Sequence, residues 1–219
     1  MAIKIIVTDV DGTLTRAGEV AKEGARDTLF SPHTSAFQSL AKEQWESAIN
    51  QGGNRHDAIR AAFIAAHFPA EEIDGLVAVY AARYGDIAEE LVVQGGVYPE
   101  TVQALQDWKK SFPLYGVSVT PQESLDRTLE GLGLRRFFKK IYGASRSKNE
   151  DLQTIIADEG VSPKEVLLIG DGTTDERAAV ATGCRFIGVK TTSNQWKDKP
   201  FPLVEKLTEV KSILTRERW

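Results

Sequence analysis

The chain has 219 residues, which is enough for one large domain or for a core domain with a smaller insertion. Hydrophobic residues make up 42% and charged residues 26%, as in ordinary globular proteins. The net charge of −4 argues against a nucleic-acid partner, and no apolar run is long enough to suggest a membrane partner.

The predicted elements begin with a buried strand at residues 3–7, after which residues 18–94 contain no convincing strand. Apolar side chains recur there at helical spacing, and glycine or proline marks turns at residues 52–53 and 68–69. We therefore expect an all-helical insertion. Its apolar stripes comprise Phe37, Leu40, Ala41, Trp45 and Ala48; Ile59, Ala62, Phe63 and Ala66; and Ile73, Leu76, Val77, Tyr80, Tyr84, Ile87, Ala88 and Leu91.

Helical and strand patterns alternate from residue 97 onward. We expect helices at residues 99–110, 124–132 and 149–159, and strands at 114–119, 140–142, 166–169 and 186–189. This alternation predicts right-handed crossovers between parallel strands. The expected fold is therefore α/β, with a Rossmann-like parallel sheet covered by helices on both faces. Residues 1–17 and 95–219 would form this core, and residues 18–94 the helical domain.

Polar residues follow the ends of the predicted strands. They are Asp9, Asp11, Ser118, Thr120, Asp171 and Asp175. The carboxyl ends of parallel strands lie at one edge of a sheet, where ligands bind in folds of this class. We therefore expect side chains that are far apart in the sequence to converge, namely Asp9, Asp11, Ser118, Asp171 and Asp175.

A cluster of carboxylates predicts a metal-assisted chemistry. Neighbouring carboxylates repel one another and take up protons unless a cation compensates, and oxygen ligands suit Mg²⁺. With its charge maintained, Asp9 could attack a phosphorus atom and form an acyl phosphate. Asp11 could protonate the leaving oxygen and later activate water. Gly12 would let the backbone approach the phosphate closely.

Two motifs carry a resemblance to a known family. DVDGT at residues 9–13 resembles the first motif of the haloacid-dehalogenase-like (HAD) superfamily, and GDGTTD at residues 170–175 resembles its fourth motif. The resemblance extends over the whole chain. It implies a phosphoglycolate-phosphatase-like enzyme, with a helical cap domain at residues 18–94 inserted after the first motif.

The resemblance also implies roles for individual residues. Asp9 would be the nucleophile and Asp11 the acid/base, a combination that separates the phosphatases of the family from its dehalogenases. The Mg²⁺ ligands would be Asp9, the backbone carbonyl of Asp11, and Asp171. Asp175 would support the site or reach the metal through a water molecule.

Two further site positions each have an alternative. The second motif of the family requires a serine or threonine at the end of a strand, and the spacing to residues 132–134 favours Ser118 over Thr120 as the phosphoryl ligand. The third motif requires a basic residue before the fourth. Lys148 fits that position, with Arg146 as the alternative, although the common Lys-Pro form of this motif is missing.

The polar junction at residues 52–56 allows two interpretations. In one of them Arg55 or His56 contacts the leaving group of the substrate. In the other the junction is a helix–helix loop in which Asn54 caps the following helix.

The predicted function is a magnesium-dependent phosphatase for a small phosphorylated metabolite, such as a sugar phosphate or a phosphoglycolate-like compound. A phosphomutase or phosphotransferase with the same intermediate is the alternative, because cap closure and water exclusion decide between them. A non-catalytic binding protein on this fold is a third hypothesis, but binding alone does not require so costly a charge cluster.

Location and assembly are predicted from simpler features. Cys184 is the only cysteine, which excludes an intrachain disulfide, and Asp9 ends the N-terminal apolar run before it reaches the length of a signal peptide. We therefore expect a cytoplasmic protein. It would be a monomer or a homodimer, with the helical face around Tyr80 and Tyr84 as a candidate dimer surface.

Overall fold

The chain forms two units in the computed structural model, which describes residues 2–16, 21–51, 53–192, 194 and 196–216. One unit comprises Met1–Glu19 and Gly95–Trp219, and the other comprises Val20–Gln94. The predicted boundary between residues 17 and 18 and the predicted turn residue Gly52 lie outside the described residues.

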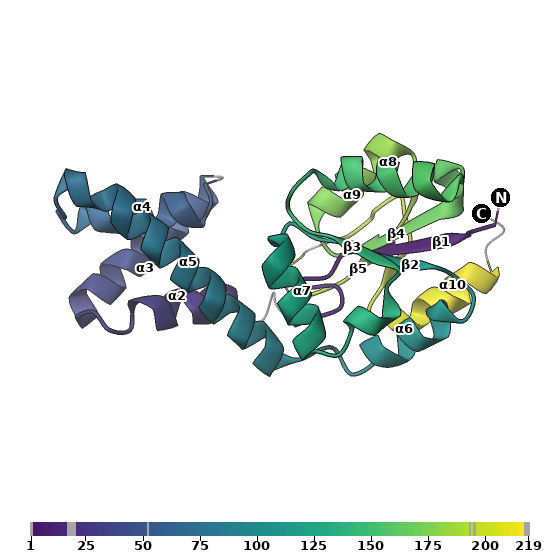
Figure 1. The fold of residues 1–219 in the computed structure, drawn as a ribbon, viewed down its shortest axis with the longest axis horizontal. Helices are drawn as coiled ribbons and strands as arrows, with labels where there is room; N and C mark the ends of the chain where they lie inside the picture. Colours follow the sequence, from purple (N-terminus) through teal and green to yellow (C-terminus); the bar gives the residue numbers. More distant parts are fainter. Residues whose placement is uncertain (1, 17–20, 52, 193, 195, 217–219) are drawn as a thin grey trace. The chain divides into compact units, whose positions relative to one another are not determined.

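A parallel sheet forms the centre of the first unit, as predicted (Figure 1). Its six strands lie in the order β3-β2-β1-β4-β5-β6, and every neighbouring pair is parallel. β1 therefore lies inside the sheet. The connection from β3 to β4 passes from one side of β1 to the other. The strands are β1 (Ile5–Thr8), β2 (Leu114–Val117), β3 (Lys140–Tyr142), β4 (Val166–Gly170), β5 (Arg185–Val189) and β6 (Leu203–Val204).

Helices cover both faces of this sheet, which confirms the predicted α/β class (Figure 1). One layer contains α6 (Thr101–Lys109), α7 (Gln122–Gly131) and α10 (Val210–Arg216), and the other contains α8 (Lys148–Glu159) and α9 (Thr173–Thr182). Successive residues of β1 place their side chains on opposite faces of the sheet. Ile6 packs in the first core, whereas Ile5 and Val7 pack in the second.

Local sequence explains where α8 starts. Ser147 caps α8, since its backbone N–H donates to Glu150 Oε2 at 2.8 Å and its hydroxyl accepts from Glu150 N at 3.4 Å. This capping box makes Lys148 the first residue of the helix.

Two strands differ from the prediction. The strand predicted at residues 3–7 is found at Ile5–Thr8, and the two-residue β6 has no counterpart among the predicted strands because it is too short to show a pattern.

The second unit is helical, as predicted, and none of its described residues forms a strand. Its helices are α2 (Lys22–Phe30), α3 (Ser35–Asn50), α4 (Arg55–Ala65) and α5 (Ala70–Gly95). Its core includes Trp45, Phe63 and Val77. The Tyr80 ring lies 4.9 Å from that of Phe63, and the Tyr84 ring lies 5.1 Å from that of Trp45.

Both tyrosines therefore contribute to the interior of the helical unit, and a dimer surface around them stays a prediction. Among the described residues, we find no helix that has the length and apolar character needed to cross a bilayer.

Candidate active site

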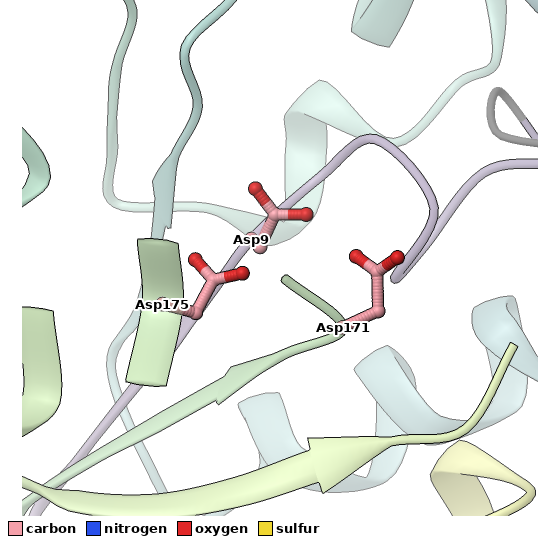
Figure 2. Close-up of side chains that lie close together, drawn as sticks. All are labelled: Asp9, Asp171 and Asp175. Atoms are coloured by element: carbon pink, nitrogen blue, oxygen red, sulfur yellow. The ribbon is translucent and has the colours of Figure 1, made fainter. Parts of the chain in front are cut away.

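Three carboxylates from separate parts of the sequence meet at one edge of the sheet (Figure 2). Asp9 follows β1, Asp171 follows β4, and Asp175 lies in the first turn of α9. One oxygen of each carboxylate lies within 4.8 Å of the others. Asp9 and Asp175 are buried, with 4% and 1% of their surface exposed. The group is therefore a compact, largely dehydrated cluster of acidic side chains.

Strand register brings these residues together. β1 and β4 are neighbours, and Thr8 pairs with Ile169, so the chain leaves both strands at the same edge. Glycine at position 170 lets Asp175 approach, because a Cβ atom there would lie 2.4 Å from Asp175 Cγ. The N–H of Gly172 donates to Asp175 Oδ2 at 3.0 Å and fixes the orientation of that carboxylate.

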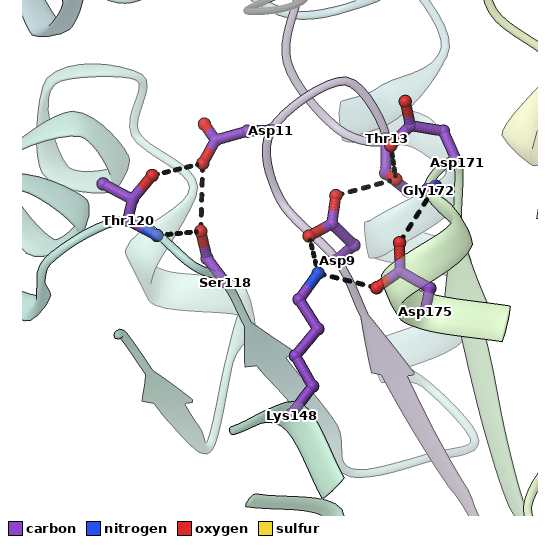
Figure 3. A network of polar contacts seen from close by, with 9 residues as sticks. All are labelled: Asp9, Asp11, Thr13, Ser118, Thr120, Lys148, Asp171, Gly172 and Asp175. Atoms are coloured by element: carbon purple, nitrogen blue, oxygen red, sulfur yellow. Dashed lines mark hydrogen bonds and ion pairs between the residues drawn. The ribbon is translucent and has the colours of Figure 1, made fainter. Parts of the chain in front are cut away.

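Lys148 joins two of the three carboxylates (Figure 3). Its Nζ lies 2.5 Å from Asp9 Oδ1 and 2.6 Å from Asp175 Oδ1. Burial alone would lower the pKa of the Lys148 ammonium, but Asp9 and Asp175 raise it well above its usual value. The two carboxylates therefore favour the charged form of Lys148 within the cluster.

The alternative residue Arg146 lies elsewhere. Its Nη2 is 3.0 Å from Oδ1 of the buried Asp151, and its Nη1 donates to Thr154 Oγ1 at 3.1 Å. The structure therefore places Lys148, and not Arg146, against the acidic cluster.

Thr13 is a site residue to which the sequence analysis assigned no role. Its hydroxyl lies 3.1 Å from Asp9 Oδ2 and 3.0 Å from Asp171 Oδ1 (Figure 3). A hydroxyl has one proton, so Thr13 shares it between the two carboxylates. Its place in the DVDGT motif was the available signal, but sequence position alone does not show which atoms a side chain reaches.

Asp11 accepts hydrogen bonds from the hydroxyl groups of both Ser118 and Thr120 (Figure 3). Ser118 Oγ donates to Asp11 Oδ2 at 3.0 Å, and Thr120 Oγ1 donates to the same oxygen at 2.7 Å. The N–H of Thr120 also donates to Ser118 Oγ at 3.0 Å. Ser118 and Thr120 therefore belong to one turn and act on one carboxylate, which leaves both as candidates for the phosphoryl ligand.

The environment of Asp11 favours its protonated form. Burial raises the pKa of its carboxyl group above the usual value, and the negative charge of Asp9 raises it further. The hydrogen bonds from Thr120 and Ser118 lower it only in part. A carboxyl group in this state can serve as a proton donor.

Gly12 lies directly against Asp171. Its φ of +91° is a conformation that favours glycine, and a Cβ atom would lie 2.6 Å from Asp171 Oδ2. Any side chain at position 12 would therefore displace a carboxylate of the cluster.

The remaining candidates, Arg55 and His56, lie in the helical unit. Asn54 caps α4, since its Oδ1 accepts from His56 N at 2.8 Å and its backbone N–H donates to Asp57 Oδ2 at 2.8 Å. The Arg55 guanidinium lies 5.9 Å from the centroid of the Tyr84 ring, and His56 is exposed. The capping interpretation of Asn54 is thus confirmed, while substrate contacts by Arg55 and His56 stay a prediction.

The charge of the acidic cluster and the chemistry of its donor atoms suit a divalent cation. Burial, followed by the charge of Asp9, raises the pKa of Asp171 to about 6 and that of Asp175 to about 7. One ammonium faces three carboxylates, so negative charge is in excess. All donors are oxygen atoms, which are the ligands that Mg²⁺ prefers.

These pKa values predict how metal-free stability depends on pH. Between about pH 4 and about pH 7 the folded chain binds more protons at Asp171 and Asp175 than the unfolded chain does. The contribution of these two groups to the free energy of unfolding therefore decreases as the pH rises through this window. In EDTA, we expect the thermal midpoint to fall across the window in the wild type.

Magnesium ions should reverse this trend, because they bind the ionised carboxylates and stabilise the folded state most at the upper end of the window. Asp171→Asn should have a flatter metal-free profile. A wild-type midpoint that falls across the window no more than that of Asp171→Asn would contradict the assignment. Differential scanning fluorimetry with EDTA and with Mg²⁺ measures both effects.

Comparison with known protein families gives one match over most of the chain. A family model described as haloacid dehalogenase-like hydrolase matches residues 3–183. Among curated proteins, the phosphoglycolate phosphatase of Escherichia coli strain K12 is 31% identical over 127 residues, which cover 55% of this chain and 50% of that protein. The phosphoglycolate phosphatase of Salmonella typhimurium is 30% identical with the same coverage. The chain thus spans about half the length of the curated relatives it matches.

Solved structures share the fold over nearly the whole chain. A haloacid dehalogenase-like family protein from Streptococcus pneumoniae has a TM-score of 0.71 at 19% identity and covers 96% of this chain and 98% of its own. The HAD-hydrolase YfnB from Bacillus subtilis, described as bound to magnesium, also has a TM-score of 0.71, at 20% identity, with coverages of 98% and 100%. At these identities the likeness concerns the fold.

Proposed function

Because the chain belongs to the haloacid dehalogenase-like hydrolases, we propose that it is a magnesium-dependent phosphatase that uses Asp9 as its nucleophile. The observation that carries the proposal is the Asp9 carboxylate itself. It is buried at the end of β1, bound by Lys148 and Thr13, and faces Asp171 in a cluster that suits a cation. The curated relatives named phosphoglycolate phosphatase support the choice of phosphate esters as substrates.

In the first step an Asp9 oxygen attacks the phosphorus atom, and the bond between phosphorus and the ester oxygen breaks. Asp11 donates its proton to the departing oxygen, in keeping with its raised pKa. In the second step Asp11, now ionised, takes a proton from water, and the water oxygen attacks phosphorus. The bond between phosphorus and Asp9 then breaks, which releases inorganic phosphate and restores the carboxylate.

The other polar residues hold the reacting groups. Lys148 forms an ion pair with Asp9 and keeps this carboxylate oriented, and Ser118 or Thr120 binds a phosphoryl oxygen through its hydroxyl. Asp9, Asp171 and the backbone carbonyl of Asp11 would hold Mg²⁺, with Asp175 beside them. The ion would neutralise charge on the phosphoryl group. The magnesium in the B. subtilis relative supports this cofactor.

Substrate class, cap and assembly are part of the same proposal. We infer a small phosphorylated metabolite, such as a sugar phosphate or a phosphoglycolate-like compound, with residues 18–94 acting as the cap domain. A cytoplasmic location and a monomeric or homodimeric state stay predictions.

The test is phosphate release from a panel of small phosphate esters, with Mg²⁺ and with EDTA. Release that requires Mg²⁺ supports the proposal, and the ranking of the esters narrows the substrate class. An isomerised sugar phosphate without net phosphate release would indicate the phosphomutase alternative. No release and no isomerisation from any ester would leave a non-catalytic role as the better explanation.

A role for Arg55 in specificity has its own prediction. Arg55→Ala should raise KM for the preferred ester, because a guanidinium contact to the leaving group would be lost. It should leave KM unchanged for a small generic ester that lacks this group. Steady-state kinetics on both esters separates the two results, and equal effects on both would remove Arg55 from the substrate site.

A further inference from the structure

Asn194 connects the segment after β5 to the loop that carries Asp171. Its Nδ2 donates to the backbone carbonyl oxygen of Asp171 at 3.1 Å and to that of Val189 at 2.8 Å. Carbonyl oxygens only accept hydrogen bonds, so the two contacts identify this side-chain atom as the amide nitrogen. Both protons of the amide are therefore used to hold backbone.

The two carbonyl groups lie where the strand pairing ends. β4 and β5 pair as far as Gly170 and Gly188, and Asp171 and Val189 are the next residues along the two strands, although Val189 still pairs with Val204 of β6 on its other side. If the β4–β5 ladder continued, further ladder bonds could satisfy such carbonyls. Here the Asn194 amide supplies both donors, so it fixes the distance between the two strand ends at the position of Asp171.

The segment is also held by a contact that does not involve Asn194. Trp196 is buried, and its ring lies so close to β5 that a Cβ atom at Gly188 would be 2.3 Å from Trp196 Cζ3. The ring also packs against Phe186, at 5.8 Å between centroids, and against Phe201, at 5.6 Å. Loss of the Asn194 amide should therefore release the Asp171 loop while Trp196 stays in place.

Two other polar side-chain atoms near this contact are buried. Asn194 Oδ1 and Thr191 Oγ1 are buried and have no hydrogen-bond partner among the described residues. Buried polar atoms in folded proteins nearly always have a partner, so both are expected to bind ordered water.

We propose that Asn194 is a positioning residue that holds Asp171 in place and thereby sets the affinity of the site for Mg²⁺. Asp171 contributes a carboxylate to the cluster, and its backbone is the part of the residue that Asn194 holds. The inference rests on the proposed function in one respect, namely that Mg²⁺ is the cation bound by the cluster. Groups that orient metal ligands typically change metal affinity about 10- to 100-fold when they are removed.

The experiment measures Mg²⁺ affinity directly, by isothermal titration calorimetry on the substrate-free protein. Asn194→Ala should raise the Kd for Mg²⁺ about tenfold or more. Asn194→Asp has nearly the same shape but loses both donors and places a carboxylate against two carbonyl oxygens, so its Kd should rise further. Thr192→Ala, an exposed position in the same segment, should keep the wild-type Kd and serves as the matched control.

Kinetics provide a second readout that a general structural defect would not reproduce. At saturating Mg²⁺, Asn194→Ala should regain most of the wild-type kcat and keep the wild-type KM for a phosphate ester, since only the ion is bound less tightly. Thermal unfolding in EDTA shows whether the variants are folded. Asn194→Ser, which can still donate one hydrogen bond, should give an intermediate Kd.

The outcomes separate this inference from the proposed function. If the wild type binds Mg²⁺ and Asn194→Ala binds it equally well, the inference is overturned and the proposed function stands. If the wild type neither binds Mg²⁺ nor releases phosphate, the proposed function fails first. If Asn194→Ala and Asn194→Ser both fail to fold, Asn194 is a structural residue and the positioning role is again overturned.

Discussion

Asp9→Asn is expected to abolish phosphate release while the chain remains folded. The amide is a much weaker nucleophile than the carboxylate, so we expect a loss of about 10⁴-fold or more in kcat. Folding should be preserved because Lys148 Nζ also lies 2.6 Å from Asp175 Oδ1, so the ammonium keeps a partner. One negative charge fewer in a crowded cluster also reduces the repulsion that raises the pKa of Asp171 and Asp175.

The measurement is phosphate release at saturating Mg²⁺, together with thermal unfolding. Asp158→Asn is the matched control, because Asp158 is exposed on α8 and undergoes the same chemical change. The control should behave like the wild type in both assays. Appreciable turnover by Asp9→Asn would show that another group attacks phosphorus.

Lys148→Met is expected to reduce both stability and activity. Methionine fills much of the space of the lysine side chain, so the main change is the loss of the ammonium between Asp9 and Asp175. Removing one partner of a buried ion pair typically destabilises a protein by about 3–5 kcal/mol. We expect a decrease of this order in metal-free protein near neutral pH, and a smaller decrease with Mg²⁺, which would compensate the same charges.

The destabilisation should also depend on pH. At about pH 5 the carboxylates of the variant can take up protons, which removes part of their repulsion, so the difference from the wild type should be smaller there. Urea unfolding at both pH values, with and without Mg²⁺, measures these differences. Lys164→Met, at an exposed position, is the control. A decrease in stability that neither pH nor Mg²⁺ changes would indicate lost packing instead of lost charge.

The sequence was sufficient to predict the fold because its signals are local. Alternating helix and strand patterns after residue 97 identify a parallel sheet, and buried apolar runs such as Val166–Gly170 mark its central strands. Helical periodicity identified the second unit for the same reason. β6 could not be predicted, since a strand of two residues, Leu203–Val204, is too short to show a period.

The candidate site was predictable where strand ends position the residues. Asp9 and Asp171 follow neighbouring strands, so the topology alone brings them together. The choice between Ser118 and Thr120 could not be made by spacing, because one turn places both hydroxyls on the same oxygen of Asp11. Sequence spacing cannot resolve contacts that depend on the path of a loop.

Asn194 was not predictable from the sequence for a related reason. Its partners are backbone carbonyls, and one of them lies 23 residues away along the chain. Every residue has a backbone carbonyl group, so no sequence motif indicates which carbonyl groups a side chain will contact. The contact is apparent only in the folded structure.

The central claim is that Asp9 becomes covalently phosphorylated, and the most direct test is to detect this species. The protein would be mixed with its preferred phosphate ester and Mg²⁺, quenched in acid within the first turnover, and examined by intact and peptide mass spectrometry. We predict an adduct with the mass of one phosphoryl group on the peptide that contains Asp9, and no adduct in Asp9→Asn. Phosphate release at the wild-type rate without such an adduct, or with the adduct on another residue, would contradict the mechanism.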